Sequence, residues 1–223
     1  MIISIDGPAG SGKSTVASIL AKKLGFIHFN SGSLYRAITA HLIANNVDVK
    51  NLSNSSLLKD LKLEVKFLFD EQHVFVNDID YTSNLRNITV STLTPIVSIQ
   101  PKVRSIVDNA QRKIAELYNL VVDGRDIGSY VFPNAETKFY LDCDIAERAR
   151  RRKKELKNES LTLKEIEKML HERDTFDKNK KIAPLVIPNG AIIIDSTNLN
   201  IDEVVDEMLK HIKYKNWKKF LKT

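Results

Sequence analysis

The segment that most constrains the fold of this 223-residue chain lies near its N-terminus. Residues 7–14 read Gly-Pro-Ala-Gly-Ser-Gly-Lys-Ser and fit the pattern G-x-x-x-x-G-K-[ST]. The apolar run Ile2–Ile5 predicts a buried strand before this loop, and an apolar stripe ended by Gly25 predicts a helix after it. In that context the loop amides converge on phosphate oxygens, Lys13 reaches the terminal phosphates and Ser14 helps to hold Mg²⁺. The motif therefore predicts a P-loop for a nucleoside triphosphate, with Mg²⁺ as cofactor.

The rest of the chain predicts an α/β fold whose pattern changes twice, from helical periodicity to period 2 at Leu61 and back to helical periodicity at Val103. Short buried runs at 26–29, 120–123, 137–141 and 191–194 alternate with helical periodicity at 33–44 and 103–117, which implies a parallel sheet flanked by helices. Between them, residues 63–69 and 74–76 alternate with period 2 and predict an antiparallel hairpin. We expect a core of residues 1–60 and 100–223, with a lid at about 148–181, and a small β-rich insert of residues 61–99.

Charge and cysteine content limit the partners and the compartment. The chain has 34 basic and 28 acidic residues, but residues 210–223 hold six lysines and no acid, so the remainder balances at 28 each. A broad nucleic-acid-binding face is therefore not expected, and the tail is interpreted as a basic amphipathic closing helix. Cys143, interpreted as a core residue on a buried strand, cannot form an intramolecular disulfide, and no apolar run is long enough to span a membrane. We expect a cytoplasmic protein that does not bind membranes.

Charged residues outside the loop favour a kinase over the other P-loop classes. No Asn-Lys-x-Asp element for guanine is present, which argues against a GTPase. Arg125 and Asp126 follow a buried strand, at the end where open α/β sheets bind ligands. Three arginines at 148, 151 and 152 share one face of a predicted helix, an arrangement suited to polyphosphate. By itself, the Arg173 and Asp177 pair further on would be a surface salt bridge; beside these features we interpret it as part of a closing lid.

Together these motifs resemble those of bacterial cytidylate kinases, from Ile3 to about Met208. The most specific elements are Ser31-Gly-Ser-Leu-Tyr-Arg36 and Asp123-Gly-Arg-Asp126. Supporting ones are Gly7 to Thr15, Val103-Arg104, Phe132-Pro-Asn-Ala135, Arg173-Asp174-x-x-Asp177 and Ala183-Pro-Leu185. The resemblance implies a P-loop core with a nucleoside-monophosphate-binding insert and a short arginine lid.

The resemblance also implies a role for each matching residue. The ATP site would comprise Gly7, Pro8, Ala9, Gly10, Ser11, Gly12, Lys13, Ser14 and Thr15, with Lys13, Arg148, Arg151 and Arg152 acting on the transferring group. Arg36 and Arg125 would grip the acceptor phosphate, and Arg104 and Asp126 would contact cytosine. The remaining acceptor-site residues would be Ser31, Tyr35, Arg173, Asp177 and Lys180.

Three positions depart from the family pattern. Asn30 stands where the family usually has aspartate, Lys180 where it usually has arginine, and Pro95 where a base-contacting serine is expected, so that Thr92, Thr94 or Ser98 would have to make that contact.

The function expected from these features is transfer of a phosphoryl group from ATP to CMP or dCMP by a monomeric enzyme. Two alternatives stay open at this stage. One is a P-loop kinase for another nucleoside monophosphate or for a metabolite such as shikimate, and the other is a nucleic-acid-binding ATPase that uses the lysine tail.

Overall fold

The computed structural model describes residues 1–49, 52, 58–68, 71–85, 87–156 and 161–213. The chain divides into two compact units, and the division falls inside strand β2. One unit comprises Met1–His28 and Asn119–Thr223, and the other comprises Phe29–Tyr118. The second unit is wider than the 61–99 insert expected from the sequence, because helices on both sides of the hairpin pack with it. The two units are described separately below.

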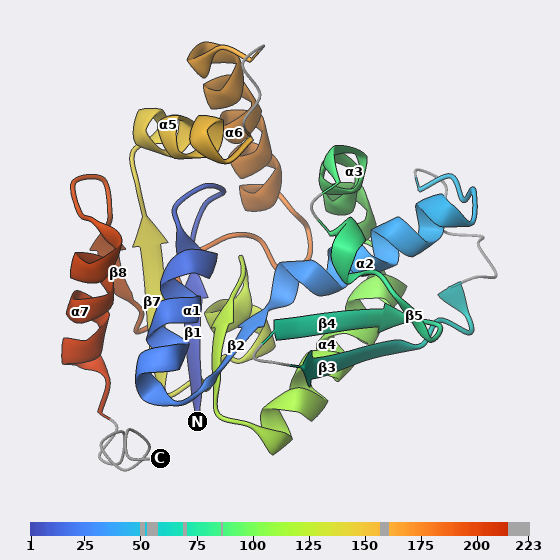
Figure 1. Ribbon diagram of the computed structural model, residues 1–223, viewed down its shortest axis with the longest axis horizontal. Coiled ribbons are helices and arrows are strands. Elements are labelled where there is room, and N and C mark those ends of the chain that lie inside the picture. Colours follow the sequence, from blue (N-terminus) through green and yellow to red (C-terminus); the bar gives the residue numbers. More distant parts are fainter. Residues whose placement is uncertain (50–51, 53–57, 69–70, 86, 157–160, 214–223) are drawn as a thin grey trace. The chain divides into compact units, whose positions relative to one another are not determined.

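The first unit is built on the predicted parallel sheet (Figure 1). Its strands are β1 (Ile2–Asp6), β2 (Ile27–Asn30), β6 (Leu120–Asp123), β7 (Thr137–Asp142) and β8 (Ile192–Asp195), in the order β2-β6-β1-β7-β8. The first strand of the chain is therefore the central one, with Ile3 paired in parallel to Val121 on one side and to Thr137 on the other. Because the carboxyl ends of β1 and β6 meet at one edge, the segments after Asp6 and Asp123 lie beside each other.

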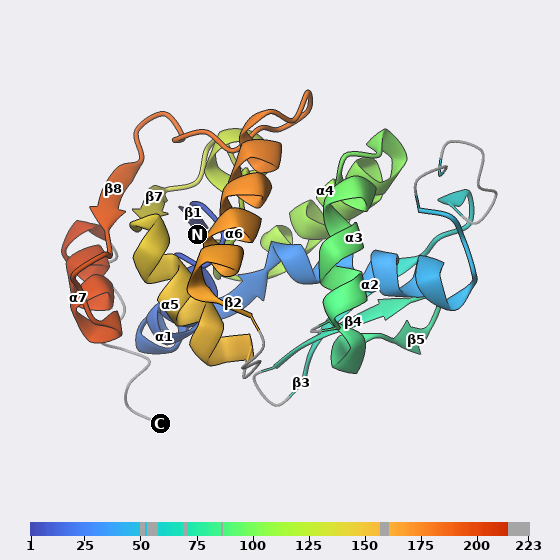
Figure 2. The same ribbon diagram turned by 90° about the horizontal axis from the view of Figure 1, so that it is seen from above.

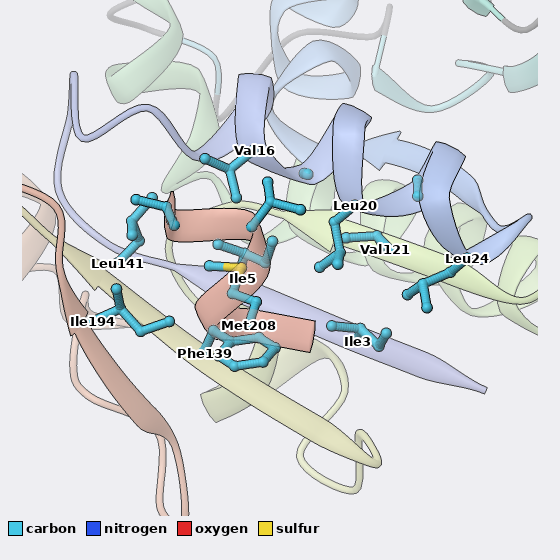
Figure 3. Packing of buried hydrophobic residues seen from close by; sticks show 14 of the residues in the cluster. Ile3, Ile5, Val16, Leu20, Leu24, Val121, Phe139, Leu141, Ile194 and Met208 are labelled. Atoms are coloured by element: carbon cyan, nitrogen blue, oxygen red, sulfur yellow. The ribbon is translucent and has the colours of Figure 1, made fainter. Parts of the chain in front are cut away.

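Helices α1 (Lys13–Leu24) and α7 (Ile201–His211) bury their apolar stripes against this sheet. Gly25 ends α1 in the left-handed conformation, and a capping box of Asn200 and Glu203 begins α7. Figure 3 shows the resulting core, to which α1 contributes Val16, Leu20 and Leu24, α7 contributes Met208, and the strands contribute Ile3, Ile5, Val121, Phe139, Leu141 and Ile194.

A second pair of helices, α5 (Ile145–Leu156) and α6 (Leu163–Lys178), packs together in the same unit (Figure 2). Ala149 of α5 and Ile166 and Leu170 of α6 form a small buried cluster. A short π-helix, η4 (Ile127–Val131), follows β6 and was not anticipated from the sequence.

The second unit contains the predicted hairpin and three helices. Strands β3 (Leu63–Leu68) and β4 (Glu71–Val76) pair antiparallel, and a two-residue strand, β5 (Ile79–Asp80), extends the sheet. Helix α2 (Ser31–Ala44) packs on β4, on α3 (Ile88–Ser98) and on α4 (Pro101–Leu117), with a 3₁₀ turn, η3 (Thr82–Asn84), between β5 and α3.

Two predictions at the chain's second half need correction. Cys143 is buried, but it follows β7 instead of lying on it. Helix α7 ends at His211, so the predicted tail helix does not continue through 212–213, and residues 214–223 lie outside the described part of the chain. Within that described part, no helix is long and apolar enough to cross a membrane.

Candidate functional site: a phosphate loop beside a cation cluster

The loop between β1 and α1 takes a conformation that depends on glycine. A Cβ on Gly7 would lie 2.2 Å from the backbone oxygen of Leu141 on β7, so only glycine fits where the loop leaves the sheet. Gly12 has φ 89°, in the left-handed region, and directly precedes the first residue of α1. The amides of the loop therefore gather at a helix N-terminus, as the motif predicts for phosphate binding.

Lys13 is buried at the start of α1. Its ammonium donates to the backbone oxygen of Pro8 at 2.5 Å and to the hydroxyl of Ser11 at 3.2 Å. Burial lowers the pKa of Lys13 well below its ordinary value, and the charge of Arg125 lowers it further. The ammonium thus lies inside the loop that it is expected to serve.

Ser14 contacts Asp123, a buried carboxylate to which the sequence assigned no role. Its hydroxyl donates to Asp123 Oδ2 at 2.6 Å, and His28 Nε2 lies 2.7 Å from Asp123 Oδ1. Burial alone would raise the pKa of Asp123, but His28 and Ser14 lower it below the ordinary value, which keeps the carboxylate ionised. The one sequence feature that could have revealed a role for Asp123 is its position as the last residue of a predicted strand. In the structure this strand, β6, lies beside β1.

A cluster of three cations surrounds Asp177, which is fully buried. Asp177 Oδ2 accepts from Arg125 Nε at 3.0 Å and from Arg173 Nε at 3.1 Å, and Oδ1 lies 2.8 Å from Lys180 Nζ. Burial raises the pKa of Asp177, but these cations together lower it far below the usual range. The Arg173–Asp177 pair is therefore not a surface salt bridge, and the cluster carries a net charge of about +2.

The segment that carries Arg125 and Asp126 is held by the end of β1. Asp6 accepts from the backbone N–H groups of Ile127 and Gly128, each at 2.7 Å. Asp126 is buried, and its backbone oxygen accepts the first hydrogen bonds of η4. The same strand end thus positions both the phosphate loop and the Asp126 segment.

The three predicted arginines of α5 have different surroundings. Arg151 donates from Nη2 to the backbone oxygen of Ser196 at 2.7 Å and from Nε to Glu147 at 3.1 Å. Arg152 pairs with Glu155 at 2.9 Å and is partly exposed. The shared helix face predicted for them exists, but each guanidinium is held by different partners.

Arg148 is buried, and its guanidinium donates to three protein atoms. Nε donates to the backbone oxygen of Cys143 at 2.9 Å, while Nη1 donates to the backbone oxygen of Ala9 at 2.9 Å and to Asp174 Oδ2 at 2.6 Å. Asp174 was quoted as part of a motif but received no role. Nothing in the spacing of residues 9, 148 and 174 indicates that they meet.

The other candidate residues belong to the second unit, where they gather at the start of α2. Asn30 caps this helix: its Oδ1 accepts from Ser33 N and from Arg36 Nη2, both at 2.9 Å. Gln72 on β4 accepts from Asn30 N at 2.8 Å and donates to the Ser33 hydroxyl at 2.6 Å. Gln72 thus orients the turn that carries the buried Ser31 and the half-buried Arg36, a contribution that the sequence did not reveal.

Tyr35 and Arg104 meet in the same unit. The guanidinium carbon of Arg104 lies 5.8 Å from the centre of the Tyr35 ring, and Arg104 Nη2 lies 3.8 Å from Asp108 Oδ1. All three residues are buried. The structure thus brings together the second-unit residues expected to form the acceptor site.

Pro95 lies inside α3, a helix that the sequence did not predict. The hydroxyls of Thr92, Thr94 and Ser98, the three candidates for the missing base contact, each donate to a backbone oxygen of this helix. Their lone pairs stay suited to accepting a hydrogen bond.

The sequence is similar to known proteins over nearly its whole length. The family described as cytidylate kinase matches residues 3–214. The cytidylate kinase of Caldanaerobacter subterraneus subsp. tengcongensis is 43% identical over 213 residues, which cover 95% of this chain and 94% of that protein. The cytidylate kinase of Ligilactobacillus salivarius is 43% identical over 219 residues, covering 96% and 97%.

Among solved structures, the shikimate kinase of Bacteroides thetaiotaomicron has a TM-score of 0.50 at 14% identity and covers 96% of this chain and 99% of its own, a likeness of fold alone. The phosphate loop and the cation cluster agree with the match over nearly the whole sequence. The chain therefore belongs to the cytidylate kinase family of nucleoside monophosphate kinases.

Proposed function

We propose that this chain transfers the γ-phosphoryl group of ATP to CMP or dCMP and releases ADP with CDP or dCDP. The observation that carries the proposal is the placement of two anion sites at one sheet edge. The phosphate loop follows β1, and Arg125, with Arg173 and Lys180 around Asp177, follows the neighbouring strand β6. A loop for a polyphosphate beside a cluster with excess positive charge suits a phosphoryl donor and an anionic acceptor.

The residues around the loop fit a magnesium ion bound together with ATP. Ser14 supplies a hydroxyl on the first turn of α1, and Asp123 supplies an ionised carboxylate 2.6 Å from it. No group of three or more His, Cys, Asp or Glu side chains that could hold a metal ion occurs among the described residues. Ser14 and Asp123 would hold the ion, which neutralises phosphate charge when bound.

The acceptor phosphate is assigned to arginines. Arg36 and Arg125 would grip its oxygens, because a dianionic monophosphate calls for paired guanidinium forks. Arg173 and Asp177 would contact the sugar and phosphates. Lys180 would add a positive charge there, but its ammonium cannot form the two parallel hydrogen bonds of a guanidinium group. Ser31 and Tyr35 would complete the pocket.

The base is assigned to Asp126 and Arg104. Cytosine carries an exocyclic amine, which donates to a carboxylate. A hydroxyl of α3 could accept from the same amine in place of the missing serine at position 95. Purine monophosphates would be excluded by size.

The transfer itself needs positioning and charge neutralisation more than covalent catalysis. An oxygen of the acceptor phosphate forms the new bond to the γ-phosphorus as the bond to the β,γ-bridging oxygen breaks, and ADP leaves with that electron pair. Lys13, Arg151 and Arg152 would neutralise the charge shared by the transferring oxygens. Arg148 was expected beside them, but its three donated hydrogen bonds indicate a different contribution, argued below.

We propose further that the enzyme works in the cytoplasm as a monomer. The single cysteine suits a reducing compartment. The division into a P-loop core, a monophosphate-binding insert at 61–99 and a lid at about 148–181 likewise stays a prediction.

The test is a coupled ADP-release assay with each nucleoside monophosphate. CMP and dCMP should be turned over far better than UMP, on the order of 10⁴-fold, because uracil would place a carbonyl oxygen against the Asp126 carboxylate. Asp126→Asn should narrow this gap, mainly by slowing CMP. Asp202→Asn, on the exposed first turn of α7, is the matched control and should change nothing.

Equal turnover of UMP and CMP by the wild type would contradict the assignment of Asp126 to the base. Turnover of shikimate or another metabolite in place of CMP would favour the first alternative, and ATP hydrolysis stimulated by polynucleotide would favour the second.

A further inference from the structure

One residue of the phosphate loop, Ala9, is held at both its N–H and its C=O by side chains of helices α5 and α6. The N–H of Ala9 donates to Asp174 Oδ1 at 3.1 Å, and the oxygen of Ala9 accepts from Arg148 Nη1 at 2.9 Å. Arg148 and Asp174 also bind each other at 2.6 Å. The two side chains therefore close a ring of three hydrogen bonds around a single loop residue.

This contact is not an exposed ion pair that forms and breaks freely in water. The exposed fraction of Arg148 is 6% and that of Asp174 is 8%. A further bond from Arg148 Nε to the backbone oxygen of Cys143 fixes the guanidinium to the end of the β7 segment. Removing one partner from such a pair leaves a buried charge unpaired, which is costly.

Apolar packing at the same place supports the hydrogen bonds independently. The methyl group of Ala9 packs on the cluster formed by Ala149, Ile166 and Leu170. A Cβ added to the neighbouring Gly10 would lie 3.5 Å from Arg148 Cβ, so the loop runs close against α5. The middle of the loop is thus seated on the paired helices.

We propose that Arg148 and Asp174 are a positioning pair for the ATP-binding loop. They hold the backbone of Ala9 in the conformation that directs the loop amides toward the triphosphate, and they act through the loop without touching the reacting atoms. The inference rests on the proposed function for the identity of the ligand. It assigns a role to Asp174, which had none, and replaces the role expected for Arg148 over the transferring group.

The experiment compares Asp174→Asn with the wild type by calorimetric titration of ATP in the absence of acceptor. Asparagine can keep one acceptor for Ala9 N but places an amide N–H against Arg148, so the ring opens. We expect ATP affinity to fall on the order of 10-fold, about 1.4 kcal/mol. Glu172→Gln is the matched control, because Glu172 is an exposed acid on α6 whose nearest ion-pair partner, Lys168, is 4.0 Å away; its ATP affinity should not change.

Hydrogen exchange of the loop amides provides a readout that a general loss of stability would not reproduce. In Asp174→Asn the amide of Ala9 and its neighbours should exchange faster, while amides of β7 and α7 should keep their protection. CMP affinity, measured separately, should stay within about twofold. The double variant with Arg148→Lys should weaken ATP binding no more than the worse single variant, because both act on one contact.

Unchanged ATP affinity in a folded Asp174→Asn protein would overturn the proposal, as would an equal loss of ATP and CMP binding. If Asp174→Asn does not fold, Arg148→Lys alone is judged by the same criteria. Failure of the CMP assay above would leave this measurement intact, since ATP is titrated without acceptor.

Discussion

Lys13 is the side chain whose surroundings differ most from what a glycine-rich loop suggests. Its ammonium is enclosed by the loop, where burial lowers its pKa, and it donates to the backbone oxygen of Pro8 and to Ser11. Burial makes the charged form of Lys13 unfavourable, yet this lysine lies where the negatively charged phosphates are expected to bind. Bound phosphate would restore the pKa of Lys13 toward its ordinary value.

Replacement of Lys13 should therefore affect turnover more than folding. Lys13→Ala is expected to lower kcat by about 10²–10³-fold, because the lost charge acts on the developing charge of the transferring group. Turnover is measured by ADP release, and folding by circular dichroism. The control is Lys23→Ala, since Lys23 lies on the same helix but pairs with Asp206 at the exposed surface. Near-normal turnover of Lys13→Ala would contradict the kinase proposal.

The residue types of the site could be predicted, but their partners could not. The motif predicted the loop that ends at Gly12, and Lys13 and Ser14 are the first two residues of α1 directly after it. The contact of Arg148 and Asp174 with Ala9 joins residues 139 and 165 positions apart, and no local pattern encodes it. The sequence favoured a closing lid over a surface salt bridge for Asp177, but it did not reveal Arg125, 52 positions away, as a further partner of that carboxylate.

Individual elements were predictable where one periodicity dominated. The strands of the parallel sheet and helices α1, α2 and α4 agree with the predictions to within a few residues. Helix α3 was missed because its sequence is rich in β-branched residues and contains Pro95, both of which disfavour helix. It forms nonetheless, with Asn87 accepting from the N–H groups of Thr89 and Val90 at its start.

The junction of β1 with the loop gives a prediction at this scale. Gly7→Ala should destabilise the protein by several kcal/mol, because the new methyl group would meet the Leu141 oxygen of β7 and part the two strands. Gly190→Ala is the matched control: φ is also positive there, at +74°, but no atom lies within 4 Å of the new Cβ. It should cost only about 1–2 kcal/mol. Urea unfolding measures both, and equal effects would show that close approach at Gly7 is unimportant.

At the scale of the whole molecule, the α/β class and the hairpin were predicted, but the extent of the second unit was not. The change of period marked only the hairpin strands at 63–76. Helices α2 and α4, predicted correctly as helices, pack with that hairpin in the Phe29–Tyr118 unit. Periodicity reports the local conformation of a segment, and not the neighbour on which its apolar face is buried.

Global stability should depend on pH through Asp6. Burial raises the pKa of Asp6 to about 7, although Gly128 and Ile127 donate hydrogen bonds to it. The folded protein therefore keeps a proton that the unfolded chain loses near pH 4, so stability should fall as pH rises from 4 to 7, by up to about 4 kcal/mol. The depressed pKa of Asp177 acts in the opposite direction, and only below about pH 4.

Urea unfolding between pH 4.5 and 8 of the wild type and Asp6→Asn would measure this effect. Asparagine does not titrate, so the variant should lose less stability than the wild type as pH rises, whatever its absolute stability. Parallel pH profiles for the two proteins would show that Asp6 does not titrate in this range.

The position of β1 in the sheet has a consequence for how the chain is made. The central strand β1 is synthesised before both of its neighbours, β6 and β7, which lie between Leu120 and Asp142. Until Leu120 and the residues after it have been synthesised, the isoleucines of β1 have neither a hydrogen-bonding partner in the sheet nor their full core. The phosphate loop, which depends on Leu141 and Asp174, is therefore among the last parts of the molecule that can take its final shape during translation.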